Sequence, residues 1–112
     1  RMKNYTAKKL AAPKLLEFRT SGGFRVLCGK NNRQNDTLTF KAAARAHWWL
    51  HAKDVPGSHV IVATEEELAP ATLEEAALLA AWYSGARAGS HVPVDYTRRK
   101  YVKKSPDGGP GR

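Results

Sequence analysis

The sequence predicts an α+β fold with a mostly antiparallel sheet, one long helix and one short helix. Three observations carry this prediction. Short apolar runs with the length of buried strands are separated by polar turn signals. Two of these runs flank a glycine turn, which is typical of a hairpin. Two alanine-rich stretches of helical composition complete the order strand, strand, helix, strand, strand, helix, strand, which favours adjacent hairpins in one sheet.

The first predicted hairpin follows a basic leader or linker remnant over residues 1–13. Residues 15–20 alternate between apolar and polar side chains, as a half-buried strand does. The turn Ser21-Gly22-Gly23 comes next, and residues 24–28 are predicted to return as the second strand. The folded domain is therefore expected to begin at residue 14.

A polar segment over residues 29–36 is predicted to be a loop, followed by a short helix over residues 37–46. Asn35 or Asp36 is a suitable cap for that helix, and the alanine run 42–44 favours it. The segment combines basic and amide side chains. Such groups donate hydrogen bonds to phosphate, and amides also read base edges.

In the centre of the chain, two apolar strands are predicted over residues 48–50 and 60–63, and a polar loop over residues 51–59 joins them. Pro56-Gly57 marks a turn inside this loop. Polar groups held on a tight loop between buried strands are well placed to bind a ligand. The first strand carries two adjacent tryptophans, so one of them leaves the core unless both faces of the sheet are covered.

The long helix is predicted to begin at Pro70 and to end near Ser84 or Ala88. Thr72 and Glu75 have the spacing of a capping box. The middle of the helix has no charged residue, so we expect it to be buried on more than one side.

A last strand is predicted over residues 91–104, with basic residues along it. Residues 105–112 are rich in proline and glycine and are expected to form a flexible tail. The predicted domain therefore spans residues 14–104.

Charge is distributed unevenly along the chain, whose net charge is +9. Residues 1–35 contain nine Lys/Arg and one acidic residue, whereas residues 36–97 contain four Lys/Arg and eight acidic residues. Residues 98–112 again contain six Lys/Arg and one acidic residue. If the two basic ends meet in the fold, they form one positive face, which suits nucleic acid or an anionic membrane surface. No basic amphipathic helix supports the membrane alternative.

Other classes of protein are disfavoured by composition. The longest uncharged apolar run is too short to span a membrane, and the N-terminus lacks the apolar stretch of a signal peptide. Cys28 is the only cysteine, so no internal disulfide can form, which fits a reducing, cytoplasmic compartment. It lies in an apolar run and is expected to be a buried structural thiol. We expect a monomeric domain without cofactors.

Some of these residues are also of the types found in catalytic and metal sites. Asp54, Ser58 and His59 have the residue types of a hydrolase triad, but adjacent Ser58 and His59 would point to opposite sides of an extended chain. The four histidines have no ligand-like spacing, and no cysteine pair accompanies them. We therefore expect neither an enzyme nor a metal site.

Several motifs in order resemble the NFACT-R family over nearly the whole chain, about residues 15–111. The motifs are Gly29-Lys-Asn-Asn-Arg-Gln-Asn35, Leu38-Thr39, Trp49-Leu-His-Ala-Lys-Asp54, Pro56-Gly-Ser-His-Val-Ile61, Glu75-Ala-Ala77, Ala80-Ala81, Tyr83-Ser84, Val92-Pro-Val-Asp-Tyr-Thr97 and Tyr101-Val-Lys-Lys104. The resemblance implies the RNA-binding domain of NFACT proteins, which include ribosome quality-control factors. Bacterial members have also been called fibronectin-binding proteins. The family acts at the large ribosomal subunit that carries a stalled nascent chain and tRNA.

Two departures from the family pattern stand out. His47 occupies a position where the family usually has an acidic residue, so that position is expected to be more basic here. The family also continues past the equivalent of Pro110-Gly111 into further strand. Both a C-terminal domain of a longer protein and a stand-alone protein fit this pattern.

The resemblance and the charge pattern together predict a non-enzymatic RNA-binding module that contacts tRNA or large-subunit rRNA. The alternative is a protein-interaction module that docks on a ribosomal protein or an extracellular-matrix partner. Phosphate contacts are predicted for Lys30, Arg33, Lys53, Arg98, Arg99 and Lys100. Sugar or base contacts, or bracing of the loop, are predicted for Asn31, Asn32, Gln34 and Asn35. His51 and His59 are expected to donate to phosphate or to hold their loop, and Ser58 and Lys103 complete the predicted site.

Overall fold

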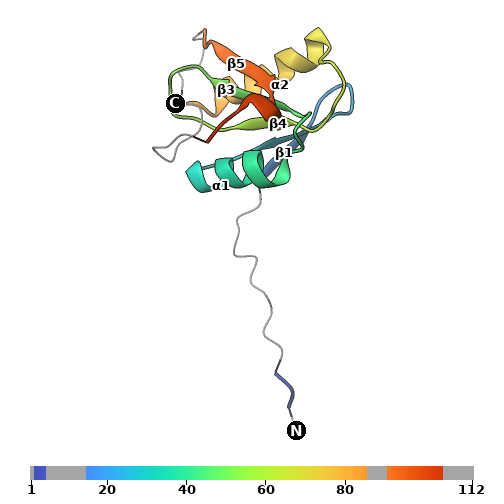
Figure 1. The fold of residues 1–112 in the computed structure, drawn as a ribbon, viewed down its shortest axis with the longest axis vertical. Helices are drawn as coiled ribbons and strands as arrows, with labels where there is room; N and C mark the ends of the chain where they lie inside the picture. Colours follow the sequence, from blue (N-terminus) through green and yellow to red (C-terminus); the bar gives the residue numbers. More distant parts are fainter. Residues whose placement is uncertain (1, 5–14, 86–90, 105–112) are drawn as a thin grey trace.

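The computed structural model describes residues 2–4, 15–85 and 91–104, and its centre is a five-stranded antiparallel sheet (Figure 1). The strands are β1 (Leu16–Arg19), β2 (Arg25–Cys28), β3 (Trp48–Ala52), β4 (Val60–Val62) and β5 (Val94–Arg98). Their order across the sheet is β1-β2-β4-β3-β5. The predicted α+β class and the predicted sequence of elements are therefore confirmed.

One face of the sheet packs against the long helix α2 (Pro70–Trp82). Alternate residues of the strands point toward α2, because side chains of a strand alternate between faces. Val26, Leu50 and Val60 are fully buried there against Ala76 and Ala80 of the helix. The two alanines have no bulk beyond Cβ, and so they let the helix approach the strands closely.

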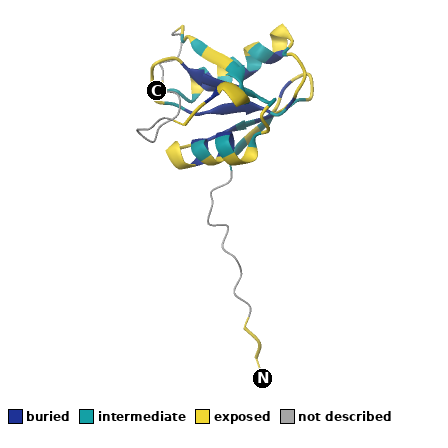
Figure 2. Ribbon diagram, in the orientation of Figure 1, coloured by how far each residue is buried: buried dark blue, intermediate teal, exposed yellow. Residues whose placement is uncertain are grey.

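The opposite face is covered by a second layer, consisting of α1 (Asn32–Thr37) and the π-helical turn η1 (Leu38–Ala42) (Figures 1 and 2). Trp49 and Ile61 point to this side and pack with Leu38. Both faces are thus buried, which explains the continuous apolar runs of the central strands. It also explains the adjacent tryptophans, since Trp48 packs against the α2 core and Trp49 against the α1 core.

The short helix begins five residues earlier than predicted. Residues 32–36, expected to be a loop, form the first turns of α1, and the cap is Asn31 instead of Asn35 or Asp36. The signal for this start is present in the sequence. Asn31 and Gln34 have capping-box spacing, and the Asn31 side chain accepts a hydrogen bond from the Gln34 backbone N–H at 2.9 Å.

The cap predicted for the long helix is also wrong. The helix begins at Pro70, as expected, but its N-cap is Ala69, which makes no side-chain capping bond. Glu75 instead accepts hydrogen bonds from the backbone N–H and the hydroxyl of Ser21, at 2.8 and 2.6 Å. The predicted capping residue therefore fastens α2 to the β1–β2 turn. Ser21's two hydrogen bonds lower the pKa of the Glu75 carboxyl group.

The last predicted strand is shorter than expected. β5 ends at Arg98, and Arg99–Tyr101 form a 3-10 turn, η2. The predicted tail over residues 105–112 lies outside the described residues, as does most of the predicted leader over residues 1–13.

Candidate nucleic-acid interface

Two parts of the chain differ sharply in charge. Residues 54–85, which include β4 and α2, contain six acidic residues and no lysine or arginine. The other helical layer and the segment after β5 are basic. Residues 29–47 and 99–104 together contain eight Lys/Arg and one acidic residue, Asp36. We call the surface formed by α1, η1 and residues 99–104 the α1 face.

The α1 face is assembled from segments that are far apart in the chain. Arg99 and Thr39, for example, are in contact although 60 positions separate them in the sequence. The Arg99 side chain donates to the Thr39 carbonyl, and the Lys100 N–H donates to the Arg45 carbonyl at 2.9 Å. Val102 is buried with Leu38 in the core beneath η1. Residues 99–104 therefore run back along η1 and α1, and the two basic stretches of sequence form one surface.

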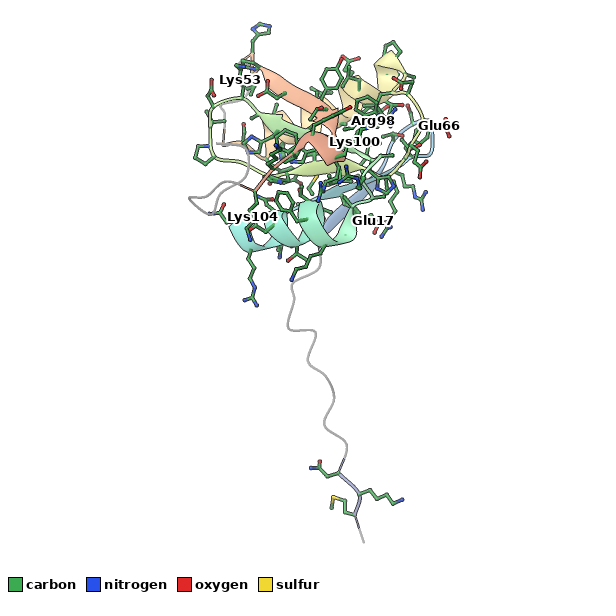
Figure 3. All side chains as sticks on the ribbon, viewed as in Figure 1. Glu17, Lys53, Glu66, Arg98, Lys100 and Lys104 are labelled. Atoms are coloured by element: carbon green, nitrogen blue, oxygen red, sulfur yellow. The ribbon has the colours of Figure 1, made fainter. Side chains whose placement is uncertain are left out.

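Six cations of the α1 face are exposed and form no ion pair with any residue in the described ranges. These are Lys30, Arg33, Lys41, Arg45, Lys100 and Lys103. A seventh, Lys104, lies beside α1 with its Nζ 3.5 Å from Asp36 Oδ2 (Figure 3). An exposed pair of this kind contributes about 0–1 kcal/mol and is easily exchanged for another anion. Such a concentration of unpaired cations suits a polyanion.

The start of α1 fixes the position of Lys30, Asn32 and Arg33. The Gln34 side chain accepts a hydrogen bond from the Lys30 backbone N–H at 2.8 Å, opposite the Asn31 cap. Gln34 is buried, whereas the side chains of residues 30–33 are exposed. The amide groups of Asn31 and Gln34 are used in the helix start, so the exposed Asn32 is the better placed of these amides to meet a ligand.

Asn35 serves the fold and is only 3% exposed. Its Nδ2 donates to the Gly57 carbonyl, and its Oδ1 accepts from the His59 backbone N–H, both at 3.0 Å. A Cβ at Gly29 would stand 2.2 Å from Asn35 Oδ1, so only glycine allows this approach. Asn35 and Gly29 thus hold the β3–β4 loop against α1, which brings the predicted site residues of the 30–35 stretch close to those of the 51–59 loop.

The two loop histidines are in the core. His51 lies within β3 and His59 directly precedes β4, with exposures of 5% and 1%. Trp49 Nε1 lies 3.0 Å from His59 Nδ1, and Thr39 Oγ1 lies 2.7 Å from the same nitrogen. An indole N–H can only donate, so His59 Nδ1 is an acceptor and the ring of His59 is neutral with its proton on Nε2. His51 stacks on Trp49, and burial lowers its pKa.

The rest of the β3–β4 loop is mixed in exposure. Ser58 is 6% exposed, and Asp54 adopts a left-handed backbone conformation with φ of 58°. Lys53 is exposed, with Nζ 3.6 Å from Asp95 Oδ1. Lys53 is therefore the cation that this loop can present, while Ser58 and the histidines support the loop from within.

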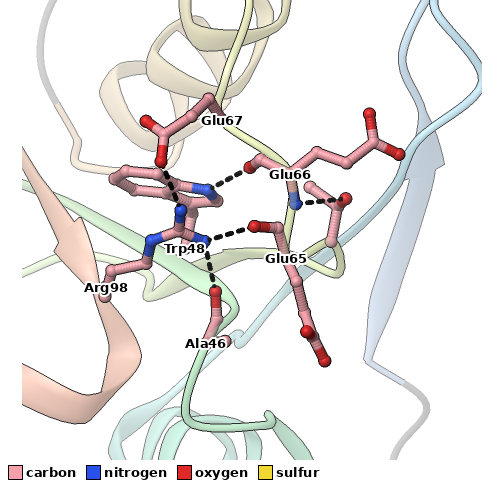
Figure 4. Close-up of polar contacts among 7 residues, drawn as sticks. Ala46, Trp48, Glu65, Glu66, Glu67 and Arg98 are labelled. Atoms are coloured by element: carbon pink, nitrogen blue, oxygen red, sulfur yellow. Dashed lines mark hydrogen bonds and ion pairs between the residues drawn. The ribbon is translucent and has the colours of Figure 1, made fainter.

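The Arg98 guanidinium binds other groups of the protein itself (Figure 4). Its guanidinium lies 4.0 Å above the Trp48 ring, and it donates to the carbonyls of Ala46 and Glu65 at 2.6 and 2.8 Å. It also forms an ion pair with Glu67 at 2.7 Å. Its side chain is only 18% exposed, so Arg98 fastens the 65–67 segment to β5 and is poorly placed to meet phosphate. Arg99 is similarly occupied, because its guanidinium reaches the Thr39 carbonyl and lies 4.9 Å from the Phe40 ring centroid.

His47 does not add charge at its position. Burial lowers its pKa, although nearby Glu65 partly opposes this shift. Its Nδ1 accepts a hydrogen bond from the Ala44 backbone N–H at 3.2 Å, which requires that nitrogen to be unprotonated. His47 therefore adds no positive charge here, and the position is more basic than the family's acidic residue would make it only because a negative charge is absent.

The remaining candidate chemistry has no geometric support in the described residues. Within those ranges, no three His, Cys, Asp or Glu side chains are grouped so that they could hold a metal ion. Cys28 is buried, and burial raises the pKa of its thiol to about 12, so it is protonated at neutral pH. None of the helices described is both long and apolar enough to cross a bilayer.

Two residues of the α1 face lie outside every segment that the sequence predicts for the site: Lys41 and Arg45. Both belong to a stretch whose pattern predicts only a helix. Their membership of the surface depends on the return of residues 99–104 along η1. No spacing in the sequence records that contact.

Comparison with known proteins identifies the family. Residues 14–110 match the family described as NFACT protein RNA binding domain. The chain is 48% identical over 99 residues to the Rqc2 homolog RqcH of Bacillus subtilis, which covers 88% of this chain and 17% of that protein. It is 45% identical over 92 residues to the Rqc2 homolog RqcH of Streptococcus suis, covering 82% of this chain and 17% of that protein. The chain thus spans less than a fifth of the length of these curated relatives.

A solved structure is similar throughout. It is the C-terminal part of the fibronectin/fibrinogen-binding protein from Streptococcus suis, with a TM-score of 0.80 and 38% sequence identity. The match covers 100% of this chain and 44% of that chain. The family match extends over most of the sequence, and the relatives agree with it. This chain belongs to the NFACT protein RNA binding domain family.

Proposed function

We propose that this chain binds RNA through the α1 face, as one domain of a ribosome-associated quality-control factor that acts in the cytoplasm. The observation that carries the proposal is the gathering on one side of the sheet of six exposed cations that form no ion pair with the residues described, whereas α2 on the other side has Glu74 and Glu75 and no lysine or arginine. A sugar–phosphate backbone would be attracted to the first side and repelled by the second. Membership of the NFACT RNA-binding family and the RqcH relatives support the same function.

The expected RNA is tRNA or rRNA of the large subunit. The site includes Lys30, Asn32, Arg33, Lys41, Arg45, Lys100 and Lys103, with Lys53 at the adjacent end of the sheet. Gln34, Asn35, His59 and Arg99 hold these residues in place from within, whereas His51 and Ser58 are buried and Arg98 binds the 65–67 segment. We propose that the domain binds without catalysing a reaction, since its buried histidines and thiol are engaged in the core.

The test is the salt dependence of binding to tRNA and to a large-subunit rRNA fragment. Phosphate contacts release counterions, so the logarithm of the binding constant should fall linearly with that of salt concentration. If the six cations each neutralise one phosphate, the slope should be about −4 on single strands and about −5 on duplex RNA. Binding that is indifferent to salt, or no binding at low salt, would overturn the proposal.

Protein binding is a second candidate function, favoured by a different surface. An apolar groove of about 400 Å³ lies between α2 and the β5 side, where Leu78 and Tyr96 are more than half exposed. The solved relative is described as a fibronectin/fibrinogen-binding protein. If this surface binds such a partner, Leu78→Asp should abolish fibronectin binding in a titration and leave RNA binding unchanged. If the wild type and the Leu78→Asp variant bind fibronectin equally well, the groove is not the binding site.

A further inference from the structure

Tyr101 is an exposed aromatic residue in the middle of the α1 face. The residue is 65% exposed and ends the η2 turn, with Lys100 before it and Lys103 two residues after it. The Lys100 Nζ lies 5.2 Å from the centroid of the tyrosine ring. Most of the ring is thus open to solvent, and a cation stands beside it.

The backbone on both sides of Tyr101 is fixed. Arg99 is anchored by its N–H to the His47 carbonyl at 2.7 Å and by its side chain to the Thr39 carbonyl. After it, Val102 is buried in the core beneath η1, and its N–H donates to the Arg99 carbonyl at 3.0 Å. Tyr101 is therefore held on a short, anchored turn, which lowers the conformational entropy lost when a ligand binds to its ring.

Two other large aromatic residues in the described ranges are exposed, and their surroundings differ. Trp82 is 72% exposed and ends α2, a helix that contains Glu74 and Glu75 and no lysine or arginine. Tyr96 is 51% exposed and lines the α2 groove together with Glu74. A nucleic-acid strand would be repelled there. Tyr101 is the exposed aromatic whose neighbours attract phosphate.

We infer that Tyr101 is a stacking platform for an unpaired RNA base, and that the α1 face accordingly prefers single-stranded or looped RNA to a continuous duplex. The inference rests on the proposed function and specifies its ligand. A base in a duplex is already stacked on its neighbours and cannot reach a protein ring, whereas an unpaired base can. Lys100 and Lys103 would neutralise the phosphates that flank the stacked base, so stacking and charge act on the same nucleotide.

The test compares an oligoadenylate of about 12 nucleotides with a blunt RNA duplex of matched phosphate number, a length within the usual range for single-strand binding. Tyr101→Ala should weaken oligoadenylate binding about 5- to 150-fold, which is the effect of losing one stacked base. The slope of binding against salt should stay unchanged, because no charge is removed. Tyr101→Phe keeps the ring and should bind as the wild type does. Tyr96→Ala is the matched control and should also bind normally.

The outcomes separate this inference from the proposed function. Wild-type protein that binds oligoadenylate with the expected salt slope, together with unchanged binding by Tyr101→Ala, would overturn the stacking inference alone. Equal losses on oligoadenylate and duplex would also overturn it, since a duplex offers no free base. Wild-type protein that binds neither RNA would overturn the proposed function and the inference with it. Thermal melts of the variants should be unchanged, because the Tyr101 side chain is exposed.

Discussion

The core of this domain contains polar side chains as well as apolar ones. Trp49, His51, His59 and Thr39 form one buried group, in which indole, imidazole and hydroxyl are in mutual contact. His59 is neutral in this arrangement, because its Nδ1 accepts from an indole donor, and burial lowers the pKa of His51. Polar groups placed in a core in this way depend on keeping every partner.

Stability should therefore fall as the solution becomes acidic. Burial lowers the pKa of His51 in the folded state, against opposing effects of the Ala52 backbone and Asp95. The unfolded state then binds more protons than the folded state, so stability is full above the unfolded pKa of about 6.5 and decreases as pH falls through it. Burial lowers the pKa of His47 in the same direction. Thermal melts between pH 7.5 and 5.5 should show a falling Tm, before the carboxylates titrate.

The matching variant is His51→Gln, which should be less stable at neutral pH and should lose part of this pH dependence. His91→Gln is the control, because it removes an exposed histidine outside the core. A His51→Gln protein with the wild-type pH dependence would show that His51 is not responsible.

Gly29 gives the second prediction at this scale. A Cβ there would meet Asn35 Oδ1 at 2.2 Å and the Asn35 backbone nitrogen at 2.9 Å. Gly29→Ala should lower the free energy of unfolding by about 1–3 kcal/mol, as overpacking does, and it should loosen the β3–β4 loop that Asn35 holds. The control is Gly22→Ala, whose Cβ would have its nearest contact at 3.5 Å and should change stability by at most about 0.5 kcal/mol. Equal melts for the two variants would contradict the described contact.

Among the elements, α1 differs most from what the sequence predicts, and the difference has a physical cause. Asparagine, aspartate and threonine are poor helix formers, so residues 32–37 are typical of a loop by intrinsic preference. The capping interaction between Asn31 and Gln34, and packing of Leu38 on Trp49 and Ile61, override that preference. The strands of the sheet, in contrast, follow directly from their apolar runs. Their predicted ends differ from the observed ones by a few residues, except in β5.

Asn31 and Asn32 allow the helix cap to be tested with two adjacent residues of the same type. Asn31→Ala removes the cap and should destabilise the protein by about 1 kcal/mol. Asn32→Ala changes an exposed residue in the first turn and should be neutral or slightly stabilising, since alanine is the better helix former. Urea denaturation of both proteins checks this. A larger loss of stability in Asn32→Ala would mean that the cap is misassigned.

For the whole molecule, the uneven charge along the sequence predicts one positive face only if the two basic ends meet, and the sequence does not show whether they do. The cations at residues 30–33 and 99–104 come together because Arg99, Lys100 and Val102 are fastened to η1. Part of the predicted site, however, was assigned from polar residue type alone. Residue type does not distinguish a polar group that meets a ligand, such as exposed Asn32, from one that holds the chain together, such as buried Asn35. That distinction depends on tertiary contacts.

The most direct test of the α1 face as the RNA site is a comparison of two double variants with equal net charge. Arg33→Ala/Arg45→Ala removes two cations from the α1 face, and Arg19→Ala/Arg25→Ala removes two from β1 and β2, which lie on the same side of the sheet but outside the α1 face. Binding to the same RNA should be measured over a series of salt concentrations. The first variant should bind more weakly, with a salt slope reduced by roughly 1.4 on single-stranded RNA, and the second should bind as the wild type does. Equal losses in both variants would show that net charge alone drives binding, and a larger loss in the second would place the RNA on another surface.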